Sequence, residues 1–332
     1  MKALLSFEPG SAESLRLDDL PDPQPGPGEL LVRVRACAIN YPDVLIIEDK
    51  YQLRPPRPFA PGSEIAGEIE AVGEGVAGWS TGDRIIAATG FGGLAEKVVI
   101  PADRAIRLPP ERSFEEGSAL LLTYATAIHA LLDRGRLEQG ETLLVLGAAG
   151  GVGIAAVELG KAFGARVVAA ASSDEKASAA MNAGADAALV YPLGPFDRDG
   201  QKALAALFKD AVGPDGANVI FDPVGGDYSE AALRGIAWQG RFLVVGFPAG
   251  IPKLPLNLTL LKSCDVCGVF WGAFVARDPK SNSKHIETLF RLWGEGRIAP
   301  MISATFPLER GGEAIAMLGD RRAIGKIVVT LD

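Results

Sequence analysis

A glycine-rich stretch, AAGGVG from Ala148 to Gly153, contains the first residues whose types and spacing could do chemistry. A short apolar run precedes it, as expected of a buried parallel strand, and an apolar helical pattern follows it. This order places backbone N–H groups and a helix N-terminus toward a phosphate, with no Cβ at Gly150 or Gly153. We therefore expect a dinucleotide pyrophosphate over the turn, although Ala148 replaces its first glycine. The predicted contacts are Ala149, Gly150, Gly151, Val152 and Gly153.

The next strand, RVVAAASSDEK, bears on which dinucleotide binds. An NAD site usually has Asp or Glu at the end of this strand, where it accepts from the ribose hydroxyls. Here the strand ends in Ala171 and Ser172, whose hydroxyl tolerates a 2'-phosphate, and Lys176 could pair with it. Asp174 and Glu175 suit the first turn of a helix. We predict NADPH; the alternative is that Lys176 is only a solvated surface charge.

The few cysteines and histidines limit other chemistry. Cys264 and Cys267 form a C-x-x-C within the strand-like run DVCGVF, not at a helix start, so we interpret the pair as structural. As a last strand, this run could continue a sheet across a dimer. His129 lies in an apolar helix and is expected to be packed or hydrogen-bonded, whereas His285 is expected to face solvent. Neither a histidine metal cluster nor a Ser-His-Asp triad is predicted.

Two kinds of domain are needed to position these residues. Up to about Leu120, short strands broken by Pro and Gly predict a mostly antiparallel β-domain. Ser113 and Glu116 form a capping box at the start of a helical block. Strands and helices then alternate, giving about six strands, as in a doubly wound nucleotide domain. The remaining helix and strand are too little for a third domain, so the predicted domains are residues 1–120 with 271–332, and 121–270.

Composition is that of an ordinary globular protein with 332 residues, 48% of them hydrophobic. The net charge of -8 and the lack of a basic tract argue against nucleic acid as a partner. The N-terminus has no apolar core of signal-peptide length, and no stretch is long and apolar enough to span a bilayer. Three cysteines cannot form a disulfide framework, so we expect a cytoplasmic protein.

Several motifs together cover essentially the whole chain: ACAINYPDVLIIEDKY, PGSEIAGEIEAVGEGV, LLTYATAIHAL, LGAAGGVGIAAVELGKAFGARVVAAASSDEK, FDPVGGDY, RFLVVGFPAG and RRAIGKIVV. In this order they resemble the zinc-independent quinone oxidoreductases, the ζ-crystallin-like branch of the medium-chain dehydrogenase/reductase superfamily. The resemblance implies an α/β protein with a Rossmann doubly wound parallel sheet and a discontinuous GroES-like catalytic domain. It also implies a homodimer that binds NADPH.

The resemblance assigns residues to three parts of the cofactor. Those matched to the 2'-phosphate are Ser172, Lys176, Tyr191 and Arg321, with Arg322 as the alternative to Arg321. Those near the nicotinamide are Asn40, Thr126, Gly246 and Phe247. The backbone of Asp222, Pro223 and Val224 is expected along the ribose.

The chain departs from its zinc-dependent relatives where they bind metal. Asn40 stands where they have a zinc-binding cysteine, and Gly62, Ser63 and Glu64 stand where they have Gly-His-Glu. The four-cysteine loop of a structural zinc is absent. A catalytic zinc requires three protein ligands and a water, so no metal site is predicted.

Two tyrosines are candidate donors to the substrate. In related enoyl reductases a tyrosine in an I-x-G-x-Y pattern gives a proton or hydrogen bond to the substrate carbonyl. The same place here runs from Ile47 to Tyr51, with Asp49 at the usual glycine. The alternatives are that Tyr51 only packs at the domain edge and that Tyr41, beside Asn40, is the donor.

These observations predict a zinc-free NADPH:quinone reductase. Without a Lewis acid nothing would stabilise the alkoxide of a simple alcohol, so hydride delivery to an electrophilic acceptor is favoured. Asn40 and Tyr51 would hold the acceptor's carbonyl oxygen. The first alternative is a reductase of activated C=C bonds in enones, acrylates or enoyl thioesters, and the second is a non-catalytic, crystallin-like NADPH-binding protein.

Overall fold

Contacts within the chain divide it into two units. The computed structural model describes all residues, 1–332. Unit 1 comprises Met1–Leu122 and Pro300–Asp332, and unit 2 comprises Thr123–Ala299. The first unit is therefore discontinuous, as expected from the sequence.

Unit 2 is built on a six-stranded sheet in the order β10-β9-β8-β11-β12-β13, in which every neighbouring pair is parallel. This confirms the doubly wound fold and puts DVCGVF on an edge. The strands are β8 (Thr142–Val145), β9 (Arg166–Ala171), β10 (Ala187–Val190), β11 (Ala217–Asp222), β12 (Ile236–Val244) and β13 (Asp265–Gly268). The central strands are almost fully buried, so they are continuous apolar runs rather than alternating ones.

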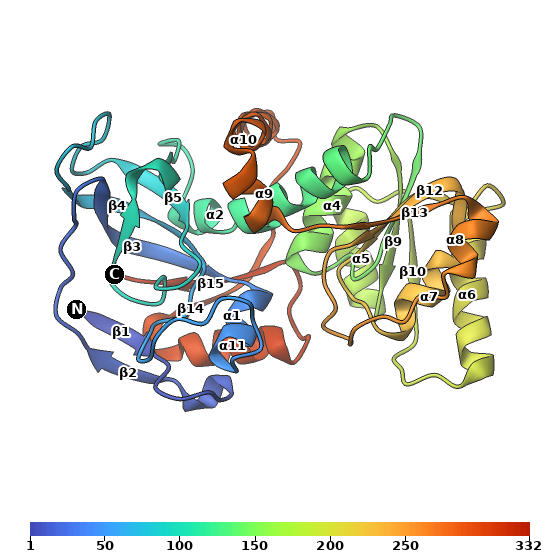
Figure 1. Ribbon diagram of the computed structural model, residues 1–332, viewed down its shortest axis with the longest axis horizontal. Helices are drawn as coiled ribbons and strands as arrows, with labels where there is room; N and C mark the ends of the chain where they lie inside the picture. The colour runs from blue at the N-terminus through green and yellow to red at the C-terminus, as the bar shows by residue number, and fades with distance from the viewer. The chain divides into compact units, whose positions relative to one another are not determined.

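Helices cover both faces of this sheet. Figure 1 has α4 and α5 on one face and α6, α7 and α8 on the other. Their bounds are α4 (Gly151–Ala162), α5 (Asp174–Asn182), α6 (Arg198–Val212), α7 (Asp227–Leu233) and α8 (Asn257–Lys262). Two of them begin at side-chain caps of the expected kind, because the Ser173 hydroxyl accepts from Lys176 N and the Asp197 carboxylate accepts from Gly200 N.

The segment 271–299 packs with unit 2, whereas we expected it in the first domain. It contains α9 (Trp271–Arg277) and α10 (Pro279–Gly294). The ring of Phe274 stacks on His129, with centroids 4.1 Å apart, and Ala299 N bonds to the Glu158 carboxylate. An amphipathic pattern predicts that α10 buries one face, but it does not tell which unit covers that face.

Unit 1 contains a seven-stranded, mostly antiparallel sheet. Its order is β14-β15-β3-β4-β5-β7, with β6 also paired to β3, and only the pair β14 and β15 is parallel. The strands are β3 (Glu29–Ile39), β4 (Glu64–Val72), β5 (Arg84–Ala88), β6 (Lys97–Pro101), β7 (Ile106–Arg107), β14 (Ile302–Pro307) and β15 (Lys326–Thr330), and a separate pair is β1 (Lys2–Leu5) with β2 (Arg16–Asp19).

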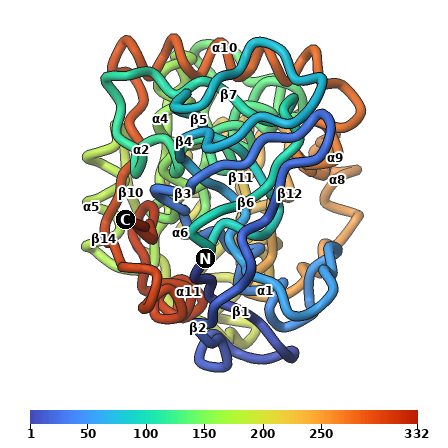
Figure 2. The backbone as a smooth tube through the Cα atoms, turned by 90° about the vertical axis from the view of Figure 1, so that its left-hand side faces the viewer, coloured from blue at the N-terminus to red at the C-terminus, as the bar shows by residue number.

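The shorter helical segments of unit 1 are α1 (Tyr41–Ile47), α2 (Phe114–Ser118), α11 (Gly311–Gly319), η1 (Ala12–Ser14), η2 (Ala102–Arg104) and η5 (Leu308–Arg310). Figure 2 shows α11, near the C-terminus, beside the N-terminal segment. The capping box of α2 is confirmed, since Glu116 N donates to Ser113 Oγ at 3.1 Å and Ser113 N to Glu116 Oε2 at 3.0 Å. The π turns η3 (Leu121–Ala125), which begins in unit 1 and ends in unit 2, and η4 (His129–Arg134) flank α3 (Thr126–Ile128).

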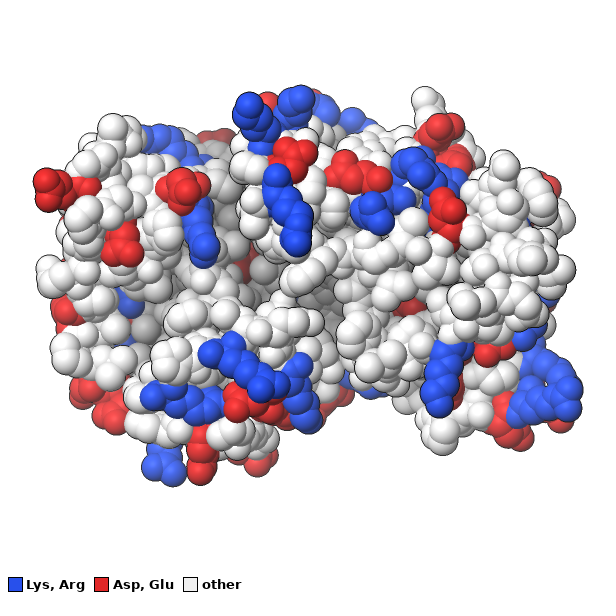
Figure 3. All heavy atoms as spheres, viewed as in Figure 1, with Lys and Arg blue, Asp and Glu red and all other residues white.

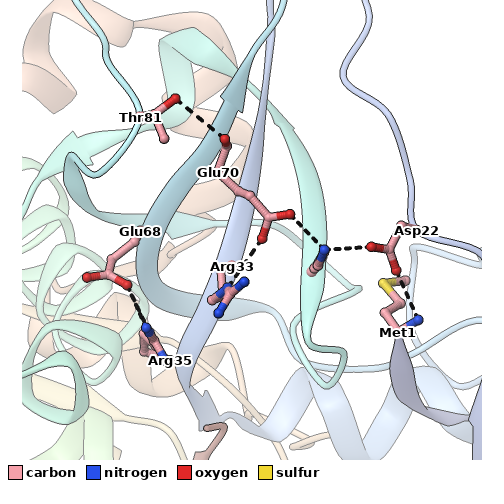
Figure 4. Close-up of polar contacts among 8 residues, drawn as sticks. Met1, Asp22, Arg33, Arg35, Glu68, Glu70 and Thr81 are labelled. Atoms are coloured by element: carbon pink, nitrogen blue, oxygen red, sulfur yellow. Dashed lines mark hydrogen bonds and ion pairs between the residues drawn. The ribbon is translucent and has the colours of Figure 1, made fainter.

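A row of charged side chains crosses the exposed face of the unit 1 sheet (Figure 4). Lys97 Nζ bridges Asp22 Oδ2 at 2.6 Å and Glu70 Oε1 at 2.7 Å. Arg33 bonds to the same Glu70 at 3.2 Å. Such exposed pairs contribute little stability individually, and here they keep the outer face of the sheet polar.

The surface is of mixed sign. On the face drawn in Figure 3, basic and acidic side chains are interspersed rather than gathered into one basic area. No helix has both the length and the apolar character needed to cross a lipid bilayer.

Candidate functional site

The turn after β8 has the geometry of a phosphate-binding loop. A Cβ built on Gly153 would lie 2.3 Å from the carbonyl oxygen of Gly147, so only glycine lets α4 pack against the turn. At Gly150 the nearest atom to an added Cβ, Gly147 O, is 3.5 Å away, and the backbone there is extended. Gly153 is thus needed for packing inside the protein, whereas Gly150 keeps the outer side of the turn open.

The helix α4 begins at this turn, and its first N–H groups precede its hydrogen-bond ladder. Ile154 N donates to Gly150 O at 2.8 Å. The N–H groups of Gly151, Val152 and Gly153 come before that bond, where a helix offers donors and partial positive charge to an anion. Ala148 N donates to Ala170 O at 3.0 Å, which anchors the turn to β9.

The residues predicted to hold the 2'-phosphate gather at the ends of β9 and β10. Lys176 Nζ lies 3.5 Å from Ser172 Oγ. Tyr191 N donates to Ala171 O at 2.9 Å, which brings the residue after β10 beside Ser172. The Tyr191 ring is buried and packs on Tyr228, with centroids 4.9 Å apart. No acidic residue ends β9, so a hydroxyl and an ammonium group mark this edge.

The loop after β11 packs on Gly147 at the start of the glycine turn, and the loop after β12 packs on the loop after β11. Val224 follows β11 and would lie 2.8 Å from a Cβ on Gly147, while Phe247 follows β12 and would lie 2.6 Å from a Cβ on Gly225. The buried Asp222 carboxylate accepts from Val224 N at 2.8 Å and Gly225 N at 2.9 Å, so its side chain shapes the loop. Burial raises the pKa of Asp222. Gly246 N donates to Asp222 O at 3.3 Å, and the Phe247 ring remains exposed.

The other predicted cofactor residues lie on different elements. Thr126 begins α3 and is half-buried. Arg321 belongs to unit 1, is exposed and has a left-handed backbone with φ of 59°. Arg322, its alternative, pairs with Asp320 at 3.2 Å.

Unit 1 contains a buried polar cluster around Asn40, Glu64 and Lys326. Lys326 Nζ donates to Asn40 Oδ1 at 2.5 Å and Glu64 Oε2 at 3.2 Å. Asn40 Nδ2 donates to Glu64 Oε2 at 3.0 Å. The Asp43 Oδ2 atom accepts from Asn40 N at 2.7 Å and from Ser63 Oγ at 3.2 Å. All five residues are at least nine-tenths buried, so these bonds replace water for each polar group.

This arrangement gives Asn40 partners that the sequence did not predict. Its two amide hydrogens are directed to Ala38 O at 3.2 Å and to Glu64 Oε2. Its side-chain oxygen accepts from Lys326. The Asn40 amide therefore holds the interior of unit 1 together in this conformation.

The same cluster does not fit a zinc ion. An amide, a hydroxyl and an ammonium group, from Asn40, Ser63 and Lys326, do not supply the Cys, His and carboxylate set that zinc prefers. No group of three or more His, Cys, Asp or Glu residues in the chain could hold a metal ion. Burial raises the Asp43 pKa to about 6, against the opposing effect of its bonds to Asn40 N, Ser63 and Gly62 N.

The backbone conformation at Asp49, two residues before Tyr51, explains why the I-x-G-x-Y pattern usually has glycine there. Asp49 has φ of 56°, in the left-handed region that glycine adopts without strain and Asp tolerates. Its carboxylate accepts from Arg57 Nη2 at 2.6 Å, which holds the loop. Tyr51 is half-buried, and burial raises its pKa, so the phenol stays protonated at neutral pH. Tyr41 is the first residue of α1 and is also half-buried.

The two histidines lie together in unit 2. His129 Nδ1 is 2.6 Å from Asp133 Oδ2, so the expected hydrogen-bonded core role is confirmed. The prediction that His285 faces solvent is wrong, because only 9% of it is exposed and its Nε2 lies 3.4 Å from Asp133 Oδ1. Its polar neighbours in sequence lie on the outer side of α10, whereas Phe274 and Asp133 cover His285. Burial lowers the His285 pKa.

The cysteines form no disulfide. Cys37, Cys264 and Cys267 are all free, and Cys264 is buried in the core of unit 2.

Comparison with known proteins places both units in one superfamily. Residues 26–110 match the family model described as alcohol dehydrogenase GroES-like domain. Residues 151–289 match the one described as zinc-binding dehydrogenase, a range that excludes Asn40, Ser63 and Glu64.

Named relatives cover nearly the whole chain. Quinone oxidoreductase-like protein 2 of Rattus norvegicus is 37% identical over 312 residues, 93% of this chain and 87% of that protein. Quinone oxidoreductase of the same organism is 30% identical over 335 residues, 100% of this chain and 98% of that protein. The solved structure of Escherichia coli quinone oxidoreductase complexed with NADPH is similar with a TM-score of 0.90 at 27% identity, covering 100% of both chains. The chain therefore belongs to the quinone oxidoreductase-like branch of the medium-chain dehydrogenase/reductase superfamily.

Proposed function

We propose that the protein is an NADPH-dependent oxidoreductase that reduces a quinone without zinc. The observation that carries the proposal is the end of β9, where Ser172 and Lys176 replace the acidic residue of an NAD site. The glycine turn at Gly150 supplies the pyrophosphate position, and the similar Escherichia coli enzyme was solved with NADPH.

Different groups of unit 2 would bind the different parts of the cofactor. The N–H groups of Gly151 to Gly153 would bind the pyrophosphate, and Lys176 with Ser172 would bind the 2'-phosphate. The cofactor supplies the hydride when bound, and the chain supplies orientation. Thr126, Gly246 and Phe247 are proposed to lie along the nicotinamide.

Tyr51 is the proposed donor to the acceptor's carbonyl oxygen. Its protonated phenol can donate a hydrogen bond at the oxygen where negative charge develops. For Asn40 to donate to the same oxygen, one of its amide hydrogens has to leave Ala38 or Glu64. Tyr51 therefore carries the larger part of the proposed role, with Tyr41 as the alternative donor.

A protonated tyrosine also supports a second candidate function. In an activated C=C bond conjugated to a carbonyl, a hydrogen bond from Tyr51 would stabilise the enolate formed by hydride addition. The two activities separate in one experiment, in which NADPH consumption is followed with 1,4-naphthoquinone, with 2-alkenals and with acryloyl esters. Consumption with the quinone alone supports quinone reduction, and consumption with the alkenes alone replaces it by the second function.

Replacing Lys176 with alanine is expected to weaken NADPH binding by about 10- to 100-fold, because a charged hydrogen-bond partner of the 2'-phosphate is lost. NADH lacks that phosphate, so its affinity should change little. Fluorescence titration of both cofactors measures the difference, with Lys202→Ala on α6 as a control in which a surface lysine paired with Asp199 is removed. Equal losses for NADPH and NADH in the Lys176 variant would contradict the assignment.

A homodimer through the edge strand β13 is also proposed. The strand has no second neighbour within its sheet, and Leu256, Leu260 and Phe270 near it in sequence are strongly exposed, Leu260 by 78%. Leu260→Asp is expected to convert the dimer to a monomer in light-scattering measurements. Met181→Asp, at an exposed apolar residue of α5, is the matched control and should leave the mass unchanged. A dimer that survives Leu260→Asp would rule out this surface.

A further inference from the structure

The chain passes between its two units twice, from Leu122 to Thr123 and from Ala299 to Pro300. One carboxylate oxygen in unit 2 bonds to both connecting segments. Glu158 Oε2 accepts from the Tyr124 hydroxyl at 2.6 Å and from Ala299 N at 3.0 Å. Tyr124 is 34 residues and Ala299 is 141 residues from Glu158 in the sequence, so this oxygen joins three distant parts of the unit.

Glu158 also connects these segments to the glycine turn. It lies on α4, the helix that begins at Gly151. Tyr124, which it binds, lies two residues before Thr126. The Glu158 carboxylate therefore joins α4, the helix behind the glycine turn, to Tyr124 near the beginning of unit 2 and to Ala299 at its end.

A second carboxylate holds the first connecting segment on its other side. Within unit 1, Leu122 N donates to Glu64 Oε1 at 2.9 Å. Glu64 is fully buried and belongs to the cluster with Lys326. On the unit 1 side of the boundary Leu122 is thus bonded to Glu64, and on the unit 2 side Tyr124 is bonded to Glu158.

Tyr124 is the most deeply buried of the groups at Glu158, whereas Glu158 is half-buried and Ala299 is exposed. Tyr124 is 1% exposed, and burial raises its pKa, so its hydroxyl is a donor at all ordinary pH values. Burial also raises the Glu158 pKa to about 7, with the bonds from Tyr124 and Ala299 N acting in the opposite direction. The neighbouring cations are engaged elsewhere, since Lys161 pairs with Asp186 and Arg297 donates to Ala162 O.

We propose that Glu158 is a positioning residue for hydride transfer, which holds both connecting segments against α4. This inference rests on the proposed function, in which the glycine turn binds the pyrophosphate and Thr126 lies along the nicotinamide. When the groups that bind the two ends of the cofactor lie on different segments of unit 2, freedom between those segments lowers the fraction of molecules in a reactive geometry. Two hydrogen bonds to one carboxylate oxygen remove part of that freedom.

Through the buried Glu158 carboxyl, the stability of the protein depends on pH with a defined sign. The Glu158 pKa is higher in the folded protein than its ordinary value of 4.5, so the folded arrangement favours the protonated carboxyl. The resulting stability is fully present below pH 4.5 and is lost as the pH rises through about 7. The groups that face Glu158 are Tyr124 and Ala299 N, and neither titrates in this range. Ionisation above pH 7 therefore costs stability, but both donors bond more strongly to the carboxylate than to the neutral carboxyl, so the two segments stay held.

Three variants of the full chain test the proposal. Glu158→Gln keeps an oxygen that can accept both bonds but cannot ionise, Glu158→Leu has no acceptor, and Tyr124→Phe removes one donor. For NADPH and 1,4-naphthoquinone we expect Glu158→Leu to lower kcat by about 10-fold, as misplacement of reacting groups does. Its KM for the quinone and its affinity for NADPH should change less than twofold. Tyr124→Phe should lower kcat less, and Glu158→Gln should keep kcat near that of the wild type.

Hydrogen exchange provides a readout that does not depend on activity. The amide of Ala299 should exchange faster in Glu158→Leu than in the wild type and Glu158→Gln. Unchanged exchange at Ala299, or a Glu158→Leu variant with the kcat of the wild type, overturns the positioning role. If the wild type reduces neither 1,4-naphthoquinone nor the activated alkenes, the proposed function has failed. Hydrogen exchange at Ala299 then decides separately whether Glu158 holds the two segments. Should Glu158→Leu not fold, kcat of Tyr124→Phe decides the matter, and a Tyr124→Phe variant with the kcat of the wild type overturns the positioning role.

Discussion

Replacing Lys326 with methionine is expected to lower the free energy of unfolding by about 3–5 kcal/mol, the loss typical of breaking a buried ion pair. Lys326 Nζ lies 3.2 Å from Glu64 Oε2 and 2.5 Å from Asn40 Oδ1. Methionine fills a similar volume but leaves the fully buried Glu64 without its cation. Urea denaturation at pH 7 measures the change.

Two further variants show whether the lost stability comes from leaving the Glu64 charge unpaired or from the change of side chain itself. Adding Glu64→Gln to Lys326→Met removes the stranded charge while keeping an acceptor for Leu122 N, so it should restore part of the lost stability. Lys97→Met breaks the pairs with Asp22 and Glu70 at the surface, where water replaces them, and should cost far less. If Lys326→Met unfolds no more easily than Lys97→Met, the buried cluster does not stabilise unit 1.

Replacing Gly150 with alanine is expected to weaken NADPH binding by at least about 10-fold, or 1.4 kcal/mol, while leaving stability nearly unchanged. The backbone at Gly150 is extended, with φ of -75°, and the nearest protein atom to an added Cβ is 3.5 Å away. The new methyl group meets no protein atom closely, but it stands where the pyrophosphate must approach the backbone. Fluorescence titration and thermal unfolding measure the two effects.

Gly153→Ala is the matched comparison. Its Cβ would lie 2.3 Å from Gly147 O, so this variant should lose about 1–3 kcal/mol of stability as well as cofactor affinity. Equal destabilisation by the two alanines would contradict the distinct roles of Gly150 and Gly153. Unchanged NADPH affinity in Gly150→Ala would remove the turn from the cofactor site.

The features predictable from the sequence are those written in local patterns. The strand, glycine turn and helix around Gly150, the capping box of Ser113, and the edge position of DVCGVF all depend on residues close together in the chain. The structure confirms each of them. The left-handed Asp49 also has a local signal, because its place in the I-x-G-x-Y pattern is usually glycine.

What could not be predicted depends on contacts between distant residues. Lys326 is 286 residues from Asn40, and no pattern in the sequence pairs a lysine of the last strand with that amide. The apolar face of α10 could cover either unit, so the return to unit 1 at Pro300 was not evident. His285 follows Lys284 in a polar run, yet Phe274 and Asp133 bury it.

Steady-state oxidation of NADPH by 1,4-naphthoquinone, before and after dialysis against a metal chelator, tests the central claim most directly. We expect turnover with NADPH well above that with NADH, at a rate that chelation does not change, and no stoichiometric zinc in the purified protein. Turnover that disappears on chelation, or a preference for NADH, would contradict it.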